Sequence, residues 1–178
     1  MSESQTIERK TVSLPRVLNL STKKDGACLM GTYDSEYVCN GHLAVLRTET
    51  PGGSGGRLPR EPQYSTPGHM DGTIRLMLSE LPKTVRGPMS IVQAVVNDQG
   101  ELRRVVTTKG VHFDARYWQW VTHRCNLSIC DRPGHKTPLN GSSFVPPYPV
   151  RNVGGDTVGM IMSCLPTLDR DEHLADIA

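Results

Sequence analysis

The sequence predicts a single α+β domain in which antiparallel strands dominate and one or two short helices occur. The chain has 178 residues, which is within the usual range for one domain. Glycine and proline occur 17 and 13 times, and this composition favours short strands joined by turns over long helices. Residues 91–96 and 102–108 also flank an Asp98-Gln99-Gly100 turn, which is typical of an antiparallel hairpin.

The N-terminal part is expected to begin with a flexible leader over residues 1–11. This leader is polar and has no apolar core, so it does not have the form of a secretory signal. The apolar spacing over 14–20 is partly helical. Residues 27–33 and 37–47 then indicate two strands, the second with a bend at Asn40-Gly41.

Residues 51–72 are expected to be a loop, because prolines and glycines are concentrated there. The run Gly52-Gly53-Ser54-Gly55-Gly56 is typical of flexible linkers, including engineered ones that replace a longer loop. After this loop, Ile74, Leu76 and Leu78 alternate with other residues as the side chains of a strand do.

The second half is expected to contain the clearest helix. Asp114 can cap a helix that runs to about Arg124, with Tyr117, Trp120 and Val121 on one apolar face. The remaining segments are assigned from composition: strands at 126–130 and 158–162, loops at 131–140 and 145–153, and an acidic tail, free or briefly helical, at 169–178, so that the domain spans 12–168.

Composition limits the classes of partner. The formal net charge is +2, so a contact with DNA must come from a local patch. No apolar run approaches the roughly 20 residues that cross a bilayer, so no membrane partner is expected. The cysteines number five, and an odd count without a secretory signal favours reduced thiols in the cytoplasm.

Short catalytic motifs are absent from the sequence. It contains no Walker A loop, no G-x-G-x-x-G after a strand, no H-E-x-x-H and no G-x-S-x-G. Cys39 and His42 lie three residues apart across a bend, which fixes no thiol–base geometry. Because no nucleophile, base and orienting group come together, binding is favoured over catalysis and no catalytic residue is assigned.

One group of residues offers ligands for a metal ion. His123, Cys125, Cys130 and His135 lie within thirteen residues, and zinc accepts such a tetrahedral set. The C-x4-C-x4-H spacing is not a standard one, and two strand residues an odd number apart point to opposite faces. Two interpretations stay open: a zinc site, or two core cysteines beside surface histidines.

A cationic surface is expected on and beside the helix. Arg116, Gln119 and His123 follow one another at i, i+3 and i+7, opposite much of the apolar face. A patch of this kind binds the phosphate backbone without reading bases, and an ordinary solvated surface is the alternative. The candidate residues for nucleic-acid binding are Arg103, Arg104, Lys109, Arg116, Gln119 and His123.

Trp118 is the candidate contact residue for a partner. It is expected to project away from the apolar face of the helix, whereas Trp120 is expected to anchor the helix in the core. An exposed tryptophan can stack on a base or bind a protein partner.

Three segments resemble parts of a bacterial sliding clamp, the ring-shaped processivity factor of replicative DNA polymerase. Residues Tyr37-Val38-Cys39-Asn40-Gly41-His42-Leu43-Ala44-Val45 are similar to its strand–bend–strand, although Asn40 replaces an acidic residue and the arginine that follows in the family is missing. Val111-His112-Phe113-Asp114-Ala115-Arg116-Tyr117 is similar to the strand-to-helix transition of its last domain. Val158-Gly159-Met160-Ile161-Met162 resembles the closing strand of that domain.

The resemblance implies a DNA-associated or replication-associated protein of a phage or mobile element. A clamp subunit has three such domains and this chain has room for one, so a ring would require a homo-oligomer. A protein–protein interaction module without a nucleic-acid role is the alternative, using residues 51–72, Trp118 and the proline-rich segment 144–151. The third hypothesis is a small zinc-binding domain or metal-dependent enzyme.

Overall fold

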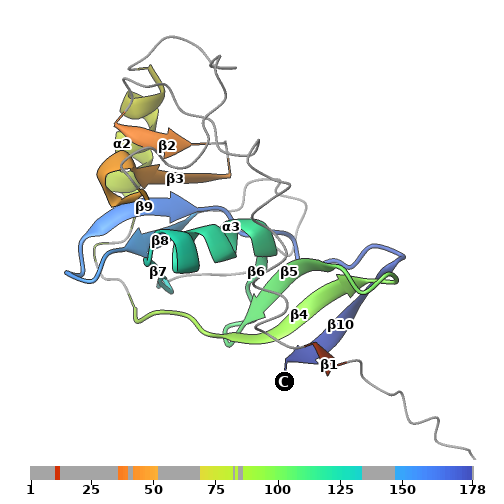
Figure 1. The fold of residues 1–178 in the computed structure, drawn as a ribbon. Coiled ribbons are helices and arrows are strands. Elements are labelled where there is room, and N and C mark those ends of the chain that lie inside the picture. The colour runs from red at the N-terminus through yellow and green to blue at the C-terminus, as the bar shows by residue number, and fades with distance from the viewer. Residues whose placement is uncertain are drawn as a thin grey trace, which may run out of the picture.

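Two five-stranded sheets make up most of the structure, which is a computed structural model (Figure 1). It describes residues 11–12, 36–39, 42–51, 69–81, 83, 86–133 and 147–177. Sheet A has the order β1-β10-β4-β5-β6, and sheet B has the order β2-β3-β9-β8-β7. All neighbouring strands pair antiparallel except β1 and β10, which are parallel. The predicted strand-rich α+β class is confirmed.

The elements have the following bounds. Sheet A contains β1 (Thr11–Val12), β10 (Glu172–Ile177), β4 (Ile91–Asn97), β5 (Leu102–Thr107) and β6 (His112–Asp114). Sheet B contains β2 (Tyr37–Cys39), β3 (Leu43–Leu46), β9 (Thr157–Ile161), β8 (Tyr148–Arg151) and β7 (Ser128–Ile129). The helical elements are η1 (Arg47–Glu49), α2 (His69–Glu80), α3 (Ala115–Gln119) and the π-helical turn η3 (Trp120–Arg124).

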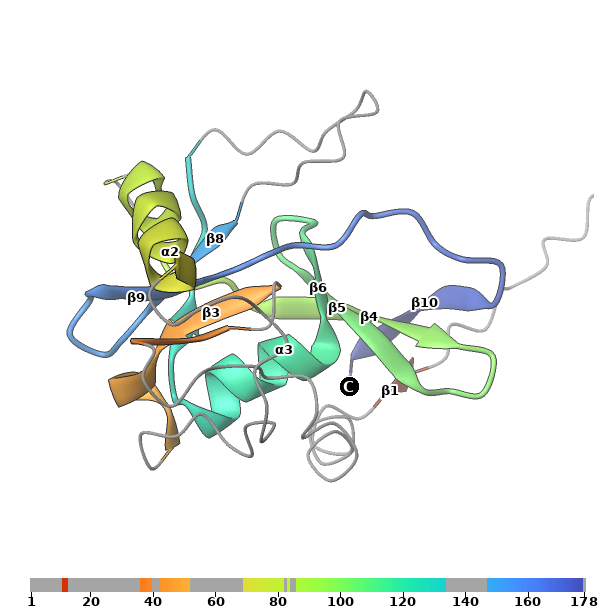
Figure 2. The same cartoon turned by 90° about the horizontal axis from the view of Figure 1, so that it is seen from above.

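Helices α2 and α3 cover opposite faces of sheet B, as the view from above shows (Figure 2). Alternation along β3 explains this arrangement. Ala44 faces the cluster that contains Ile74 of α2, whereas Leu43 and Val45 face the cluster that contains Trp118 of α3. Sheet B is therefore buried on both faces.

The main core lies where sheet A meets sheet B beneath α3. Phe113 of β6 lies edge-on to Tyr148 of β8 at a centroid distance of 5.3 Å, and 5.4 Å from Trp118. Phe113 and Tyr148 are fully buried. This aromatic contact joins the two sheets and the helix in one cluster.

A glycine allows the central strands of sheet B to approach each other. Gly159 of β9 pairs with Val45 of β3. A Cβ atom at position 159 would collide with the Ala44 carbonyl oxygen and lie 3.0 Å from the Val45 Cα. No side chain therefore fits at this position without moving a strand.

The expected strand at Ile74, Leu76 and Leu78 is wrong, because these residues belong to α2. Ile74, Leu78 and Leu81 lie at helical spacing and pack in the cluster that contains Ala44, while Leu76 is exposed. Residues 69–72, expected in the loop, are likewise the first turn of this helix.

Three boundary expectations are also wrong. The acidic tail over 169–178 contains β10, whose Ala175 is buried against Ala94 of β4. The loop over 145–153 contains β8, in which the Pro149 carbonyl accepts the Cys130 N–H at 2.9 Å. Thr11, placed in the leader, pairs with Asp176. Sheet A therefore recruits residues from outside the expected 12–168 domain.

Other expectations are confirmed or fall outside the described residues. The 91–108 hairpin is β4–β5, with Gly100 at a φ of +79°, and residues 157–161 form the late strand β9. The helix at 14–20, the strand at 27–33 and the run at 52–56 lie outside the described ranges. No helix in the described part of the chain is long and apolar enough to span a membrane.

Candidate functional site

The predicted helix begins where β6 ends, as expected from its capping residue. The Asp114 carboxylate accepts the Arg116 backbone N–H at 2.9 Å. After one α-helical turn and a half, the helix continues as η3, in which the Cys125 N–H donates to the Trp120 carbonyl at 3.1 Å. A π-helical turn of this kind is rare and is frequent at functional sites.

The inward face of the helix is wider than predicted: Val121 is fully buried and Tyr117 and Trp120 pack partly against the main core, as expected, but Trp118 and Gln119 are buried as well. Trp118 is only 5% exposed and packs on Phe113, so the expectation of an exposed Trp118 is wrong. Gln119 is buried to the same degree, which removes it from any contact surface. The helix packs on both sheets. Ala115 and Trp118 are among its buried residues, whereas Tyr117 and Trp120 are only partly buried.

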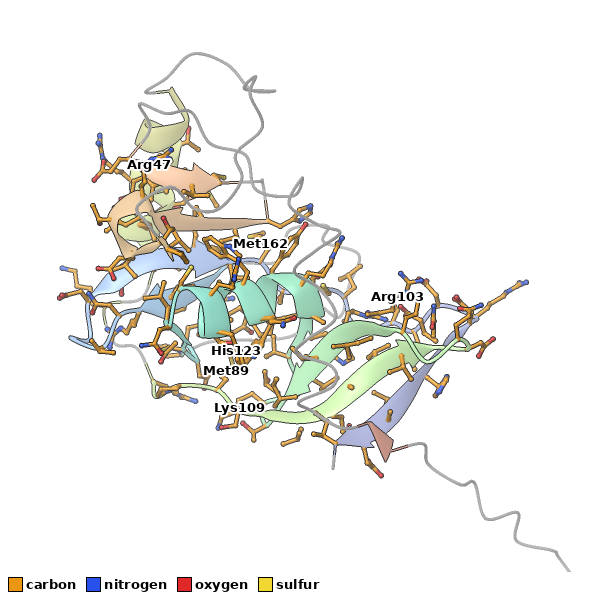
Figure 3. The ribbon with its side chains drawn as sticks, in the orientation of Figure 1. Arg47, Met89, Arg103, Lys109, His123 and Met162 are labelled. Atoms are coloured by element: carbon orange, nitrogen blue, oxygen red, sulfur yellow. The ribbon has the colours of Figure 1, made fainter. Side chains whose placement is uncertain are left out.

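The outward face carries two neighbouring aromatic rings between basic side chains. We call this surface the helix ridge, and it consists of Arg116, Tyr117, Trp120, His123 and Arg124. Arg116, His123 and Arg124 are exposed, while Tyr117 and Trp120 are partly exposed. Figure 3 shows His123 on this part of the molecule.

A stack of planar groups stands at the N-terminal end of the helix ridge. The Arg116 guanidinium lies 5.3 Å from the centroid of the Tyr117 ring, and the His42 ring stacks on Tyr117 at 5.7 Å with an interplanar angle of 18°. His42 is exposed, and it precedes β3. The stack therefore joins the helix to the residue that precedes β3 of sheet B.

The two arginines of the helix ridge differ in whether they form an ion pair. Arg116 forms a bidentate pair with Asp114, with N···O distances of 3.0 and 2.8 Å. Arg124 has no ion pair with a carboxylate within the part of the chain that the structure describes. Arg124 also lies in the last turn, where the helix dipole stabilises a cation.

Comparisons with protein-family models, curated sequences and solved structures find no match. The helix ridge is therefore interpreted from its own geometry.

Arg104 does not belong to this surface. Its guanidinium donates to the Leu165 carbonyl at 2.7 Å and the Thr167 carbonyl at 3.0 Å, and it pairs with Glu172. The side chains of Arg104 and Glu172 are only 12% and 9% exposed. This pair fastens the connection between β9 and β10 onto sheet A, which is a structural role.

The other two predicted cations, Arg103 and Lys109, are exposed and lie on elements other than the helix. Arg103 lies near the tip of the β4–β5 hairpin, to the right of His123 in Figure 3, and pairs with Glu101 at 3.3 Å. Lys109 is exposed in the turn between β5 and β6. Of the predicted nucleic-acid residues, the helix ridge thus brings together only Arg116 and His123.

The predicted zinc ligands show no assembled site within the described ranges. No group of three or more His, Cys, Asp or Glu side chains there is placed to hold a metal ion, and His135 lies outside these ranges. Burial raises the pKa of the Cys125 thiol to about 12 and also raises that of Cys130. Both thiols are therefore protonated at neutral pH.

Several residues that were expected to contact a protein partner are buried in the fold. Trp118 is buried, and in β8 so are Tyr148, Pro149 and Val150. Residues 52–68 lie outside the described ranges.

Sequence reasoning missed His42, Tyr117, Trp120 and Arg124 as surface residues. A signal for the last three was present in Arg116-Tyr117 and Trp120 followed by His123-Arg124, at helical spacing. An apolar-face assignment describes only part of Tyr117 and Trp120, because both rings pack against the core and are also partly exposed. The contact between His42 and Tyr117 depends on how the helix packs on sheet B. No local sequence pattern indicates this packing.

Proposed function

We propose that the chain binds DNA without sequence preference through the helix ridge, and that single-stranded DNA is the favoured form. The observation that supports this most is the presence of exposed basic side chains on either side of two partly exposed aromatic rings on one helix face. Cations attract the phosphate backbone, and every base presents a face that can stack on an aromatic ring. Neither contact reads the identity of a base.

The length of the helix ridge implies a modest affinity for each copy. Arg116 and Arg124 are eight positions apart, which corresponds to roughly 12 Å along a helix. A surface this short contacts only a few nucleotides. Several copies on one strand, or a closed oligomer, would raise the apparent affinity through multivalency.

The sliding-clamp resemblance gives this proposal its architectural form. In that form, several copies of the domain would surround DNA and contact its backbone, in the cytoplasm and in association with replication proteins. A clamp encloses duplex DNA, so duplex preference together with a ring-sized mass would favour the clamp form. Single-strand preference would favour the stacking contacts of the helix ridge.

Fluorescence anisotropy with a labelled oligothymidine and a mixed-sequence duplex tests the proposal. We expect the affinity to fall with salt between about 50 and 200 mM, with a logarithmic slope of about −1.4 for the two arginines of the helix ridge. The substitution Trp120→Ala should weaken the binding of single-stranded DNA by about 1–3 kcal/mol.

Two arginine variants give a matched comparison. Arg124→Ala removes one positive charge from the helix ridge and should reduce the salt slope by about 0.7. Arg103→Ala removes the same charge from β5, outside the helix ridge, and should leave binding unchanged. Equal effects of the two variants, or binding that does not depend on salt, would contradict the proposal.

A further inference from the structure

A thiol and an imidazole are placed side by side on sheet A by the connection between β9 and β10. Cys164 of this connection forms an antiparallel bridge with His112 of β6, and the Cys164 N–H donates to the His112 carbonyl at 2.7 Å. Opposite residues of an antiparallel pair project from the same face, with Cβ atoms about 4.5–5.5 Å apart. The two side chains are therefore neighbours, although 52 positions separate them (164 − 112).

His112 carries a nitrogen that lacks a partner. The residue is only 8% exposed, and its Nδ1 atom is buried without a hydrogen-bond partner within the described ranges. Buried polar atoms are nearly always satisfied by protein, water or an ion, so such an atom indicates a missing ligand. Cys164 lies directly across the bridge from it.

We propose that Cys164 and His112 form a two-ligand site for copper(I). Thiolate and imidazole are donors that this soft monovalent ion accepts, and two donors are enough for it. Binding exchanges one cation for another: the Cys164 thiol releases its proton to solvent, a sulfur–copper bond forms, and the His112 nitrogen completes the coordination. No electron is transferred in this step.

The charges around the pair favour a monovalent ion over a divalent one. Burial, followed by the nearby Asp114 carboxylate, raises the pKa of the Cys164 thiol, so the resting site holds an uncharged S–H group. Copper(I) bound to a thiolate keeps the charge of that group unchanged. A zinc ion would add a positive charge close to Arg104, whose charge already disfavours a second cation at His112.

The nearby carboxylates are already engaged. Asp114 accepts hydrogen bonds from Arg116, and Glu172 accepts them from Arg104 and the Asp169 N–H. These groups, with Arg104, are the charged neighbours of the pair on β5, β6 and β10. A third or fourth protein ligand, which a structural zinc site needs, is therefore not supplied by them.

His112 is held in the form that binds a metal ion. Burial, and then the Arg104 charge, hold the pKa of His112 below its usual value, while Glu172 opposes this shift. The imidazole is therefore neutral at physiological pH and can donate a lone pair. Its neighbour in the next strand, Val106, is apolar, so the Val106 side chain offers the nitrogen no hydrogen bond.

An anaerobic titration of the full, reduced chain with copper(I), in competition with a chromogenic chelator, tests the site. We expect one tight equivalent in the wild type. Cys164→Ser and His112→Gln should each weaken it by at least about tenfold. Cys125→Ser, which removes another partly buried thiol, should leave it unchanged.

X-ray absorption at the copper edge keeps the test decisive if a variant fails to fold. One sulfur and one nitrogen neighbour per copper in the wild type would support the site. Two or more sulfur neighbours, loss of the tight equivalent in Cys125→Ser, or no competition with the chelator would overturn it.

Discussion

Replacing Arg104 with methionine should destabilise the fold strongly, because it leaves a buried carboxylate without its cation. Arg104 and Glu172 are 12% and 9% exposed, and Arg104 also donates to two carbonyls of the β9–β10 connection. Breaking a buried pair from one side costs about 3–5 kcal/mol. For a chain of this size, that corresponds to a fall of about 6–20 °C in Tm.

Urea unfolding followed by circular dichroism measures this loss, and Arg103→Met is its matched control. Arg103 precedes Arg104 in the same strand, but it and Glu101 are 50% and 65% exposed. Exposed pairs contribute about 0–1 kcal/mol, so the control should lose no more than that. The double variant Arg104→Met with Glu172→Leu should be more stable than Arg104→Met alone. Equal losses for the two arginine variants would refute the reasoning.

Three further predictions concern stability. Gly159→Ala should cost about 1–3 kcal/mol in urea unfolding because its Cβ meets the β3 backbone, while Gly87→Ala, which meets nothing within 4 Å, should be near neutral. Trp118→Ala should cost about 3–5 kcal/mol by the same assay because it empties part of the core; a smaller loss than for Trp120→Ala would contradict the placement of Trp118. Lowering the pH from 7.5 to 5.5 should reduce the free energy of unfolding, because the unfolded state protonates His112 near its usual pKa of 6.5 while the folded state resists; His112→Gln should flatten this dependence.

Elements whose signals are local were predicted well from the sequence. The β4–β5 hairpin depends on residues within one short stretch, and so does the helix that Asp114 caps. Because the residues that form the turn and the cap are close together in the chain, both can be recognised from the local sequence alone.

Elements that depend on distant partners were missed or misassigned. β10 is acidic, and only its pairing with β4, as in Ala175 opposite Ala94, makes it a strand. In α2, an alternation of three residues fits a strand, but Ile74 and Leu78 also fit one helix face, and the contact with Ala44 selects the helix. β8 contains Pro149, whose missing N–H is harmless because its carbonyl bonds to Cys130.

The candidate site was predicted only in part, because some of its residues depend on local signals and others on distant contacts. The helix is a local feature, and so are its basic residues. Arg116 and His123 both lie on the helix ridge. The burial of Trp118 depends on Phe113, which belongs to another strand. The role of Arg104 depends on Glu172, 68 positions away, so no local pattern distinguishes it from the exposed Arg103.

The position of β10 between β1 and β4 has a consequence for how the protein is made. Strands β4, β5 and β6 emerge from the ribosome well before residues 172–177, so sheet A lacks two of its five strands until late in synthesis. During that interval Ala94 and Val96 have no cover from Ala175. Such non-local pairing folds slowly and exposes strand edges to other chains. Translation that pauses within 162–171 would therefore prolong an aggregation-prone intermediate, which chaperones would be expected to protect until β10 is synthesised.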